Sequence, residues 1–343
     1  MKVDQYLAPG AIARAPEHAV WTEKWGFDGL FSTDTAHDPF LPIAAAAAAT
    51  SRIEFGTAIA VAFGRSPMTV AYSAWDLAEL TDGRFLLGLG TQVRAHITRR
   101  FNMPWSSPGP RLREYIHALR AIWNTWQTGE RLAFKGDFYE FSLMTPFFSP
   151  APMEHWEIPV YIAGVGDYMC RVAGEVADGL HIHPFHTLRY LDEVVAPNVA
   201  AGADEAGRSV ADVEMVGTAF VISGHNDEEM AATKMAAKLQ IAFYASTPAY
   251  RGVLDLHGWD FGPELTAMSK RGEWMAMGEV ITDEVLDELC VTAPLDELGS
   301  AVRDKYGDRV DRMGIYFTEV PNQPPILTLS DEEWAALVAG IHG

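Results

Sequence analysis

Residues 81–101, TDGRFLLGLGTQVRAHITRRF, are the stretch of sequence that decides the fold of this chain. Within it, residues 85–89 form a short apolar run that is entered through Asp82-Gly83, and this pattern predicts a buried strand. Two other apolar runs are entered in the same way, through Asp28-Gly29 and Asp178-Gly179. Glycine at such a place can adopt a positive φ, which lets a helix end and the chain reverse into a strand. A buried strand that ends in a loop of glycine, polar and basic residues is typical of α/β proteins with a site at the strand end.

Candidate strands and helices alternate along the whole chain. Strands are expected at residues 3–7, 30–33, 53–61, 85–89, 160–163, 180–183, 213–222 and 312–318. Helices are expected at residues 16–25, 42–50, 67–80, 110–126, 168–177, 188–195, 227–245 and 295–306. Eight parallel strands separated by helices close most naturally into a TIM (β/α)8 barrel. A doubly wound open sheet is the alternative, but no GxGxxG motif follows the first strand.

The chain is expected to form one domain, residues 1–343, with two insertions. Residues 127–157 are rich in glycine, proline and aromatic residues, and they predict a β-hairpin and a loop over the barrel mouth. Residues 223–309 predict several helices before the last strand.

The composition is that of an acidic globular protein. Its 343 residues are 48% hydrophobic, which is enough for a full core. Asp and Glu number 46 against 26 Lys and Arg, and the formal charge of −20 disfavours nucleic acid and anionic membranes as partners. The N-terminus lacks an apolar signal core, and the alanine run at residues 44–49 is too short to cross a bilayer. We therefore expect a soluble cytoplasmic protein that acts on a small molecule.

In a TIM barrel the functional residues lie in the loops at the carboxyl ends of the strands. This rule selects a polar or glycine-containing segment after most of the predicted strands. The candidate site residues are Tyr6, Asp34, His37, Ala58, Ile59, Thr91, Gln92, Gly164, Val165, Gly166 and His183.

Two of these candidates could take part in catalysis. Asp34 follows the second predicted strand, and its carboxylate could hold a proton donor or a ring nitrogen. It could equally cap its own turn, because residues 32–35 are Ser, Thr, Asp and Thr. His37 could serve as an acid or base, although a histidine at such a position is more often a surface residue.

The Gly164-Val165-Gly166 segment is a candidate phosphate site. It follows a strand and precedes a helix, so its backbone N–H groups could receive an anion at the helix N-terminus. Asp167 would compete with an anion for the same donors. Arg94, Arg99 and Arg100 are the alternative anion ligands, unless they are ordinary surface charges.

Three histidines occur at the end of the sixth predicted strand. His181, His183 and His186 suggest a metal site, but no cluster of carboxylates accompanies them, and Pro184 interrupts the series. We therefore predict no metal. His183 is expected to face the pocket, with His181 deeper on the same face of the strand.

The sequence contains no GxSxG motif and no P-loop, so a bound cofactor would have to supply any redox chemistry. At this point five segments, which together span residues 1–185, resemble the luciferase-like monooxygenase superfamily, and within it the group that uses the deazaflavin coenzyme F420. They are WGFDGL at 25–30 leading to Asp34, SRIEFGT at 51–57, RSP at 65–67, LTDGRFLLGLG at 80–90 and AGEVADG at 173–179.

The resemblance implies a TIM barrel with a flavin or deazaflavin ring across its mouth, and hydride transfer at carbon 5 of a deazaflavin. It also implies a non-proline cis peptide bond at Ala58-Ile59 that backs the ring. Asp34 matches an acidic residue that precedes a catalytic histidine in many relatives. Here Thr35 follows it instead, and His37 is the nearest histidine.

These features lead to three hypotheses about function. The first is an F420-dependent oxidoreductase that transfers a hydride between the deazaflavin and a small carbonyl, alcohol or enone-type substrate. The second is an FMN-dependent luciferase-like monooxygenase that works with a flavin reductase. The third is a flavin-binding or storage protein without turnover.

A homodimer that uses the barrel helices is also expected. Trp75, Trp123 and Trp126 are more aromatic bulk than an outer ring of helices would bury against the barrel alone, and exposed apolar patches usually mark interfaces. The alternative is that the two insertions cover these residues, which would leave a monomer.

Overall fold

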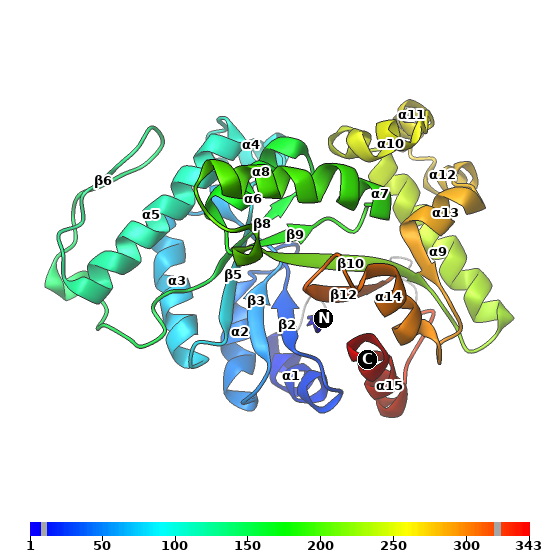
Figure 1. The fold of residues 1–343 in the computed structure, drawn as a ribbon, viewed down its shortest axis with the longest axis horizontal. Coiled ribbons are helices and arrows are strands. Elements are labelled where there is room, and N and C mark those ends of the chain that lie inside the picture. Colours follow the sequence, from blue (N-terminus) through cyan, green and yellow to red (C-terminus); the bar gives the residue numbers. More distant parts are fainter. Residues whose placement is uncertain (8–11, 319–323) are drawn as a thin grey trace.

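Eight parallel strands form a closed barrel at the centre of the molecule (Figure 1). The structure, a computed structural model, describes residues 1–7, 12–318 and 324–343. Around the barrel the strands follow the order β1, β2, β3, β5, β8, β9, β10 and β12, and β12 closes it by pairing with β1. In that order their bounds are Lys2–Tyr6, Gly29–Ser32, Glu54–Thr57, Phe85–Gly90, Val160–Gly164, Gly179–Ile182, Glu214–Ile222 and Arg312–Phe317. The predicted TIM barrel is confirmed.

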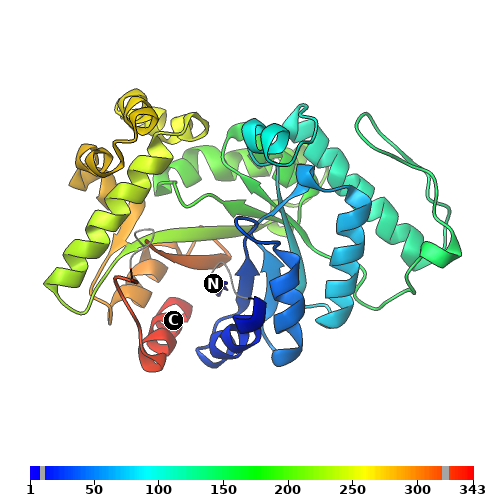
Figure 2. The same ribbon diagram turned by 180° about the vertical axis from the view of Figure 1, so that it is seen from behind.

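Helices cover the outside of the barrel, as the two opposite views show (Figures 1 and 2). They include α1 (Ala15–Lys24), α2 (Phe40–Ala46), α3 (Pro67–Leu80), α5 (Pro108–Thr128), α6 (Asp167–Val176), α8 (Ala196–Glu205), α14 (Leu298–Tyr306) and α15 (Asp331–His342). The helix expected at residues 188–195 is instead α7 (Leu188–Tyr190) followed by a π-helical turn, Leu191–Val195. The basic loop after β5 forms a short helix that the sequence did not predict, α4 (Arg94–Arg99).

The third predicted strand is interrupted just before the barrel mouth. It divides into β3 and β4 (Ala60–Val61), and the peptide bond between Ala58 and Ile59 is cis, as the resemblance implied. The backbone N–H of Ala58 donates to the carbonyl of Ser32, and β4 pairs with the end of β5. The interruption therefore keeps its hydrogen bonds to both neighbouring strands.

Aromatic rings fill the barrel interior wherever an adjacent strand supplies a glycine. A Cβ atom on Gly314 would lie 2.5 Å from the ring of Tyr6, and one on Gly56 would lie 2.3 Å from the ring of Phe31. These glycines leave the space that the rings occupy. The interior is therefore a packed core below the mouth rather than a channel.

The segment at residues 127–157 forms the expected hairpin, from β6 (Phe134–Lys135) and β7 (Glu140–Phe141). It lies at the edge of the molecule beside α5 rather than over the barrel mouth (Figures 1 and 2). The carboxylate of Glu114 on α5 accepts the backbone N–H groups of residues 137–139 at the hairpin tip. This capping explains why the hairpin stays on α5.

The tryptophans that suggested a dimer interface are buried within the single chain. Trp75, Trp123 and Trp126 are 1%, 2% and 2% exposed. Trp126 packs edge-on against Trp75 at 5.3 Å, and its Nε1–H donates to the sulfur of Met144 in the 127–157 segment. The argument for a dimer from these residues is therefore wrong, because the insertion covers them.

The second insertion places a group of helices beside the end of β10 (Figure 1). Strand β10 pairs with β9 at its start and with a short strand that the sequence did not predict, β11, at its end. None of the helices in the described ranges is long and apolar enough to cross a membrane. The elements of this insertion are α9 (Asp227–Ala245), α10 (Arg251–His257), α11 (Gly262–Arg271), α12 (Trp274–Val280), α13 (Asp283–Leu289) and β11 (Cys290–Thr292).

A buried arginine joins the last strand to the first. Arg312 on β12 is fully buried, and its Nε and one terminal nitrogen donate to the two carboxylate oxygens of Asp4 on β1 at 2.8 and 2.6 Å. Its other terminal nitrogen donates to Glu54 on β3 at 2.5 Å. One guanidinium therefore connects three strands across the seam of the barrel.

Replacing Asp4 with alanine is expected to lower the free energy of unfolding by about 3–5 kcal/mol, because Arg312 would remain buried without its bidentate partner. Urea denaturation followed by circular dichroism measures this change. The control is Glu17→Ala, which breaks an exposed ion pair with Arg14 and should cost about 0–1 kcal/mol. Equal stability of the two variants would contradict the role given to Arg312.

Candidate active site

The carboxyl ends of the barrel strands meet at one mouth, where most of the predicted site residues lie. Because the barrel is closed, β3 and β10 lie opposite each other, four strands apart in either direction. The mouth therefore has two sides. One carries the Ala58-Ile59 bond after β3, and the other is formed by β9, β10 and β12.

Asp34 is buried in an ion pair, not exposed at the strand end as a free carboxylate. Its side chain accepts the backbone N–H of Val61 at 3.0 Å and one terminal nitrogen of Arg65 at 2.5 Å. The other terminal nitrogen of Arg65 donates to Asp38 at 2.9 Å. Asp34 thus does accept a backbone N–H, but from β4 rather than from its own turn. The carboxylate fixes the chain just beyond Ala58-Ile59.

His37 does not join this cluster. It is exposed, and its ring makes no hydrogen bond or ion pair with any residue in the described ranges. The partner that sequence reasoning missed is Arg65. The motif Arg65-Ser66-Pro67 contributed to the family resemblance, but nothing in its spacing identified Asp34 as the residue that it pairs with.

The ends of the neighbouring strands β3 and β5 contact each other at the rim of the mouth. A Cβ atom on Gly90 would lie 2.6 Å from the side chain of Ile59, so only glycine leaves room for this side chain. Gln92 has a positive φ of 56°, and its side-chain oxygen accepts the N–H of Val93. Thr91 donates to the carbonyl of Gln92. These residues form a self-supporting turn at the rim.

Tyr6 points into the barrel beneath the mouth. Its hydroxyl is 3.0 Å from that of Thr218 on β10, and its ring covers Gly314. Burial raises the pKa of Tyr6 to about 12, so it stays protonated. The structure places Tyr6 as part of the floor of the site.

The Gly164-Val165-Gly166 segment is held in place and open on one side. The carbonyl of Val165 accepts the hydroxyl of Tyr190 at 2.9 Å. Gly166 is the N-cap of α6, with φ of −94°, and a Cβ atom added to it would meet nothing within 4 Å. Neither backbone conformation nor internal packing requires glycine here. The open space lies at a helix N-terminus, where unpaired N–H groups can receive a phosphate.

The three arginines considered as anion ligands lie apart. Arg100 donates to the carbonyl of Thr35 at 2.6 Å and so supports the loop that carries Asp34. Arg94 and Arg99 are exposed on α4. Among the described residues neither forms an ion pair with a carboxylate, which is consistent with surface charges.

The three histidines near the end of β9 point to different places and do not converge. His181 lies inside the barrel, 5.6 Å from the ring of Phe31, and burial lowers its pKa to about 3. His186 is buried against Tyr306, and its Nδ1 is 2.7 Å from the carbonyl of His183. His183 lies two residues above His181 on the same face of the strand, at the mouth.

Aromatic rings surround His183 and form the side of the mouth opposite Ala58-Ile59. Tyr250 stacks on the imidazole at 4.2 Å between ring centroids, and Tyr244 meets it edge-on at 4.6 Å. Phe220 on β10 stacks on Tyr316 of β12 at 5.1 Å and contacts Tyr244. We call these five residues the aromatic wall. Sequence reasoning missed Tyr244 and Tyr250, because they come from the helical insertion and reach the mouth only through tertiary packing.

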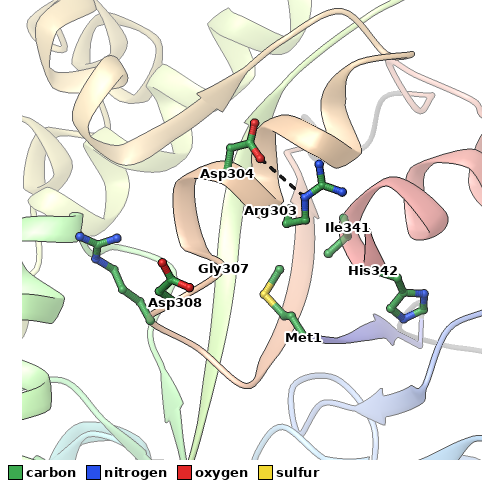
Figure 3. A pocket seen from close by; sticks show the side chains of 8 residues that line it. Met1, Arg303, Asp304, Gly307, Asp308, Ile341 and His342 are labelled. Atoms are coloured by element: carbon green, nitrogen blue, oxygen red, sulfur yellow. Dashed lines mark ion pairs between the residues drawn. The ribbon is translucent and has the colours of Figure 1, made fainter.

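A separate hollow of about 580 Å³ lies at the opposite, N-terminal end of the barrel (Figure 3). Most of its charged side chains are already paired within the chain. Arg309 forms a salt bridge with Asp192, and His342 is 2.8 Å from Asp28. The chemistry expected of a TIM barrel belongs to the other end, so we assign the site to the mouth. The hollow is lined by Met1, Arg303, Asp304, Gly307, Asp308, Arg309, Ile341 and His342.

A family model described as luciferase-like monooxygenase matches residues 2–312. The chain belongs to the luciferase-like monooxygenase family. An uncharacterized protein of Mycobacterium tuberculosis is 49% identical to this family member over 314 residues, which cover 91% of this chain and 92% of the relative. An F420-dependent glucose-6-phosphate dehydrogenase of Intrasporangium calvum is 30% identical over 214 residues, covering 58% of this chain and 62% of that enzyme.

The fold is shared with a solved structure. The coenzyme F420 dependent tetrahydromethanopterin reductase of Methanopyrus kandleri matches with a TM-score of 0.76 at 18% identity, covering 99% of this chain and 97% of that one. The family and its enzymes together identify the chain as an oxidoreductase.

Replacing Asp34 with alanine is expected to lower the free energy of unfolding by about 1–3 kcal/mol, because Arg65 and the N–H of Val61 lose a buried acceptor. Asp38→Asn is the matched control, since it removes the negative charge of the other partner of Arg65, at a side chain that is 38% exposed, and keeps an oxygen to accept the backbone N–H of Phe40. Chemical denaturation compares the two. A larger loss for Asp38→Asn would contradict the importance of the buried partner.

Proposed function

We propose that this protein is an F420-dependent oxidoreductase that transfers a hydride between the deazaflavin and an uncharged small organic substrate with a carbonyl, alcohol or enone group. The observation that carries the proposal is the aromatic wall. Its five side chains carry no formal charge at neutral pH, and it faces Ala58-Ile59 across the mouth. Such a wall suits a flat apolar molecule held against a planar ring. The F420-dependent relative supports the choice of cofactor.

The residues present fit a flavin-type cofactor with a phosphate. The cradle at Gly166 leaves space that the protein does not fill, and the N-terminus of α6 offers N–H donors to an anion. In our proposal Ala58 and Ile59 support the ring, and the Asp34–Arg65 pair keeps that support in place. When bound, the deazaflavin supplies a two-electron hydride donor or acceptor. Catalytic roles for Asp34 and His37, and cofactor contacts of Tyr6, Thr91 and Gln92, remain predictions. For His183, the predicted cofactor contact is replaced below by a proposed substrate contact.

An FMN-dependent monooxygenase is the second candidate, and the family name itself favours it. The two cofactors differ at one ring atom, which is carbon in F420 and nitrogen in FMN. Only the nitrogen ring supports the oxygen chemistry of a monooxygenase. Cofactor identity therefore decides between the two functions.

Binding of each cofactor to the purified protein tests the proposal directly. We expect the intrinsic fluorescence of F420 to change on titration with the protein, with micromolar affinity, and FMN to show no saturable binding. Tight binding of FMN without binding of F420 would instead support the FMN-dependent monooxygenase. Binding of either cofactor without turnover of any carbonyl compound or alcohol would favour a storage protein.

Replacing Gly166 with valine is expected to weaken cofactor binding about tenfold, or by about 1.4 kcal/mol, because the side chain would fill the proposed phosphate cradle. The backbone angles of Gly166 are open to any residue, so the fold should remain intact. Gly166→Ala is the matched control, because its side chain fills less of the proposed phosphate cradle. Isothermal titration provides both affinities, and unchanged binding by the valine variant would place the phosphate elsewhere.

A homodimer also remains a prediction, as does the cytoplasmic location. With the tryptophans buried, the largest exposed apolar side chains near α3 are Leu143, Phe147 and Phe148, at 78%, 89% and 61% exposure. Sedimentation equilibrium at micromolar concentration should give twice the chain mass of 37.7 kDa. A single species at the chain mass would establish a monomer.

A further inference from the structure

We propose that His183 is the residue that binds the oxygen atom of the substrate, through a hydrogen bond donated by its Nε2–H. The inference rests on the proposed function, since it presumes an oxidoreductase with its substrate in front of the aromatic wall. It assigns one atom of the protein to one atom of the substrate. It also limits the substrate to molecules with an accepting oxygen beside an apolar group.

The hydrogen bonds around His183 fix its tautomer. The backbone N–H of Phe185 donates to Nδ1 of His183 at 3.1 Å. A backbone N–H can only donate, so Nδ1 must be unprotonated, and the single proton of the neutral ring must lie on Nε2. The carbonyl of His183 is in turn 2.7 Å from Nδ1 of His186, which holds the turn that carries both residues.

The ring is kept neutral by its surroundings. Burial is the main cause that lowers the pKa of His183 to about 3, and His186 contributes. The titratable groups packed against it from the helical insertion are Tyr244 and Tyr250, whose pKa values are both raised by burial. His183 therefore offers a neutral N–H donor throughout the physiological pH range, and Nε2 has no acceptor among the described residues.

The position of the aromatic wall favours contact with the substrate rather than with the cofactor. His183 follows β9, and Phe220 and Tyr316 lie on the next two strands, β10 and β12. β10 lies opposite β3, so the wall and Ala58-Ile59 lie on opposite sides of the mouth, and residues on the two sides could hold substrate and cofactor respectively. A molecule at the mouth would meet the half-buried rings of the wall, which are backed by the fully buried Phe220, and one hydrogen-bond donor.

The donor suits the charge that develops during reduction of a carbonyl. A hydride from the reduced cofactor forms a new C–H bond at the carbonyl carbon, and the electron pair of the C=O π bond moves to the oxygen. The oxygen then takes a proton from water and becomes the hydroxyl of the alcohol. His183 keeps its own proton and stabilises the oxygen by its hydrogen bond, as a preorganised neutral donor.

Two variants distinguish the effect of losing the hydrogen-bond donor from the effect of losing the aromatic ring. His183→Phe retains an aromatic ring beside Tyr250 but removes the donor, whereas His183→Gln supplies an amide N–H near the original Nε2 position. The control is His155→Phe, at a histidine that contacts Asp82 far from the mouth. Each protein is titrated with F420 and assayed with reduced F420 and three ketones: acetone, cyclohexanone and acetophenone.

We expect His183→Phe to lower kcat/KM by ~10²-fold while the affinity for F420 stays within about twofold, and His183→Gln to recover most of the loss. The control should match the wild type. Loss of F420 affinity in His183→Phe with unchanged ketone kinetics would overturn the proposal and make His183 a cofactor ligand. Failure of His183→Gln to recover activity would also count against it.

A second measurement does not depend on turnover. In ¹⁵N NMR of the histidine-labelled protein, His183 should show a protonated Nε2 and an unprotonated Nδ1 from pH 5 to pH 8, and the Nε2 signal should shift on addition of cyclohexanone. A proton on Nδ1, or no shift with any of the three ketones, would refute the assignment. If wild-type protein neither binds F420 nor reduces a ketone, the proposed function fails, and the ¹⁵N shift still tests His183 by itself.

Discussion

The ion pair between Arg312 and Asp4 is the constraint on which the rest of the structure depends. A parallel barrel closes only when its last strand meets its first, and here that meeting point is secured by a bidentate, fully buried contact between β12 and β1. The same guanidinium reaches Glu54 on β3. A charge buried this deeply is tolerated only with its partners in place, so the contact favours the one register in which all three groups meet.

The polar base of the barrel contrasts with its mouth. Below, Arg312 and the carboxylates around it hold charges in the interior. Above them the rings of Tyr6, Phe31, Tyr161 and His181 fill the interior, and the aromatic wall lies at the mouth. The histidines of the upper layers are neutral, since burial depresses the pKa of His181 and His183. The chain thus has buried charges where the barrel closes at one end and uncharged rings at the other.

The barrel could be predicted from the sequence because the sequence patterns that mark its strands are local. Each buried strand is a short apolar run with its own entry turn, and all eight were located to within a few residues. The interruption of β3 was found only through the family resemblance, because residues 53–61 carry no local signal for it. Helix α4 was missed because a short basic segment has little periodicity to detect.

The site was harder to predict, because its geometry depends on contacts between distant residues. Asp34 was chosen correctly as a strand-end residue, but its burial comes from Arg65, which lies 31 positions away in sequence. Tyr244 and Tyr250 reach His183 from a helical segment whose own pattern describes only a helix. The tryptophans were misjudged for the same reason, since Met144 covers Trp126 from across a hairpin.

The long strand β10 joins the barrel to the helical insertion. Its first half pairs with β9 inside the barrel, while its last residues pair with β11 of the helical insertion, so Tyr244 and Tyr250 are carried on a segment anchored to the barrel itself. The surfaces assigned to the cofactor end at Gly166, and those assigned to the substrate begin at His183. The residues proposed for the cofactor therefore precede those proposed for the substrate in the sequence. A single recombination event between Gly166 and His183 would exchange the substrate-binding residues of two relatives and leave the cofactor-binding residues unchanged.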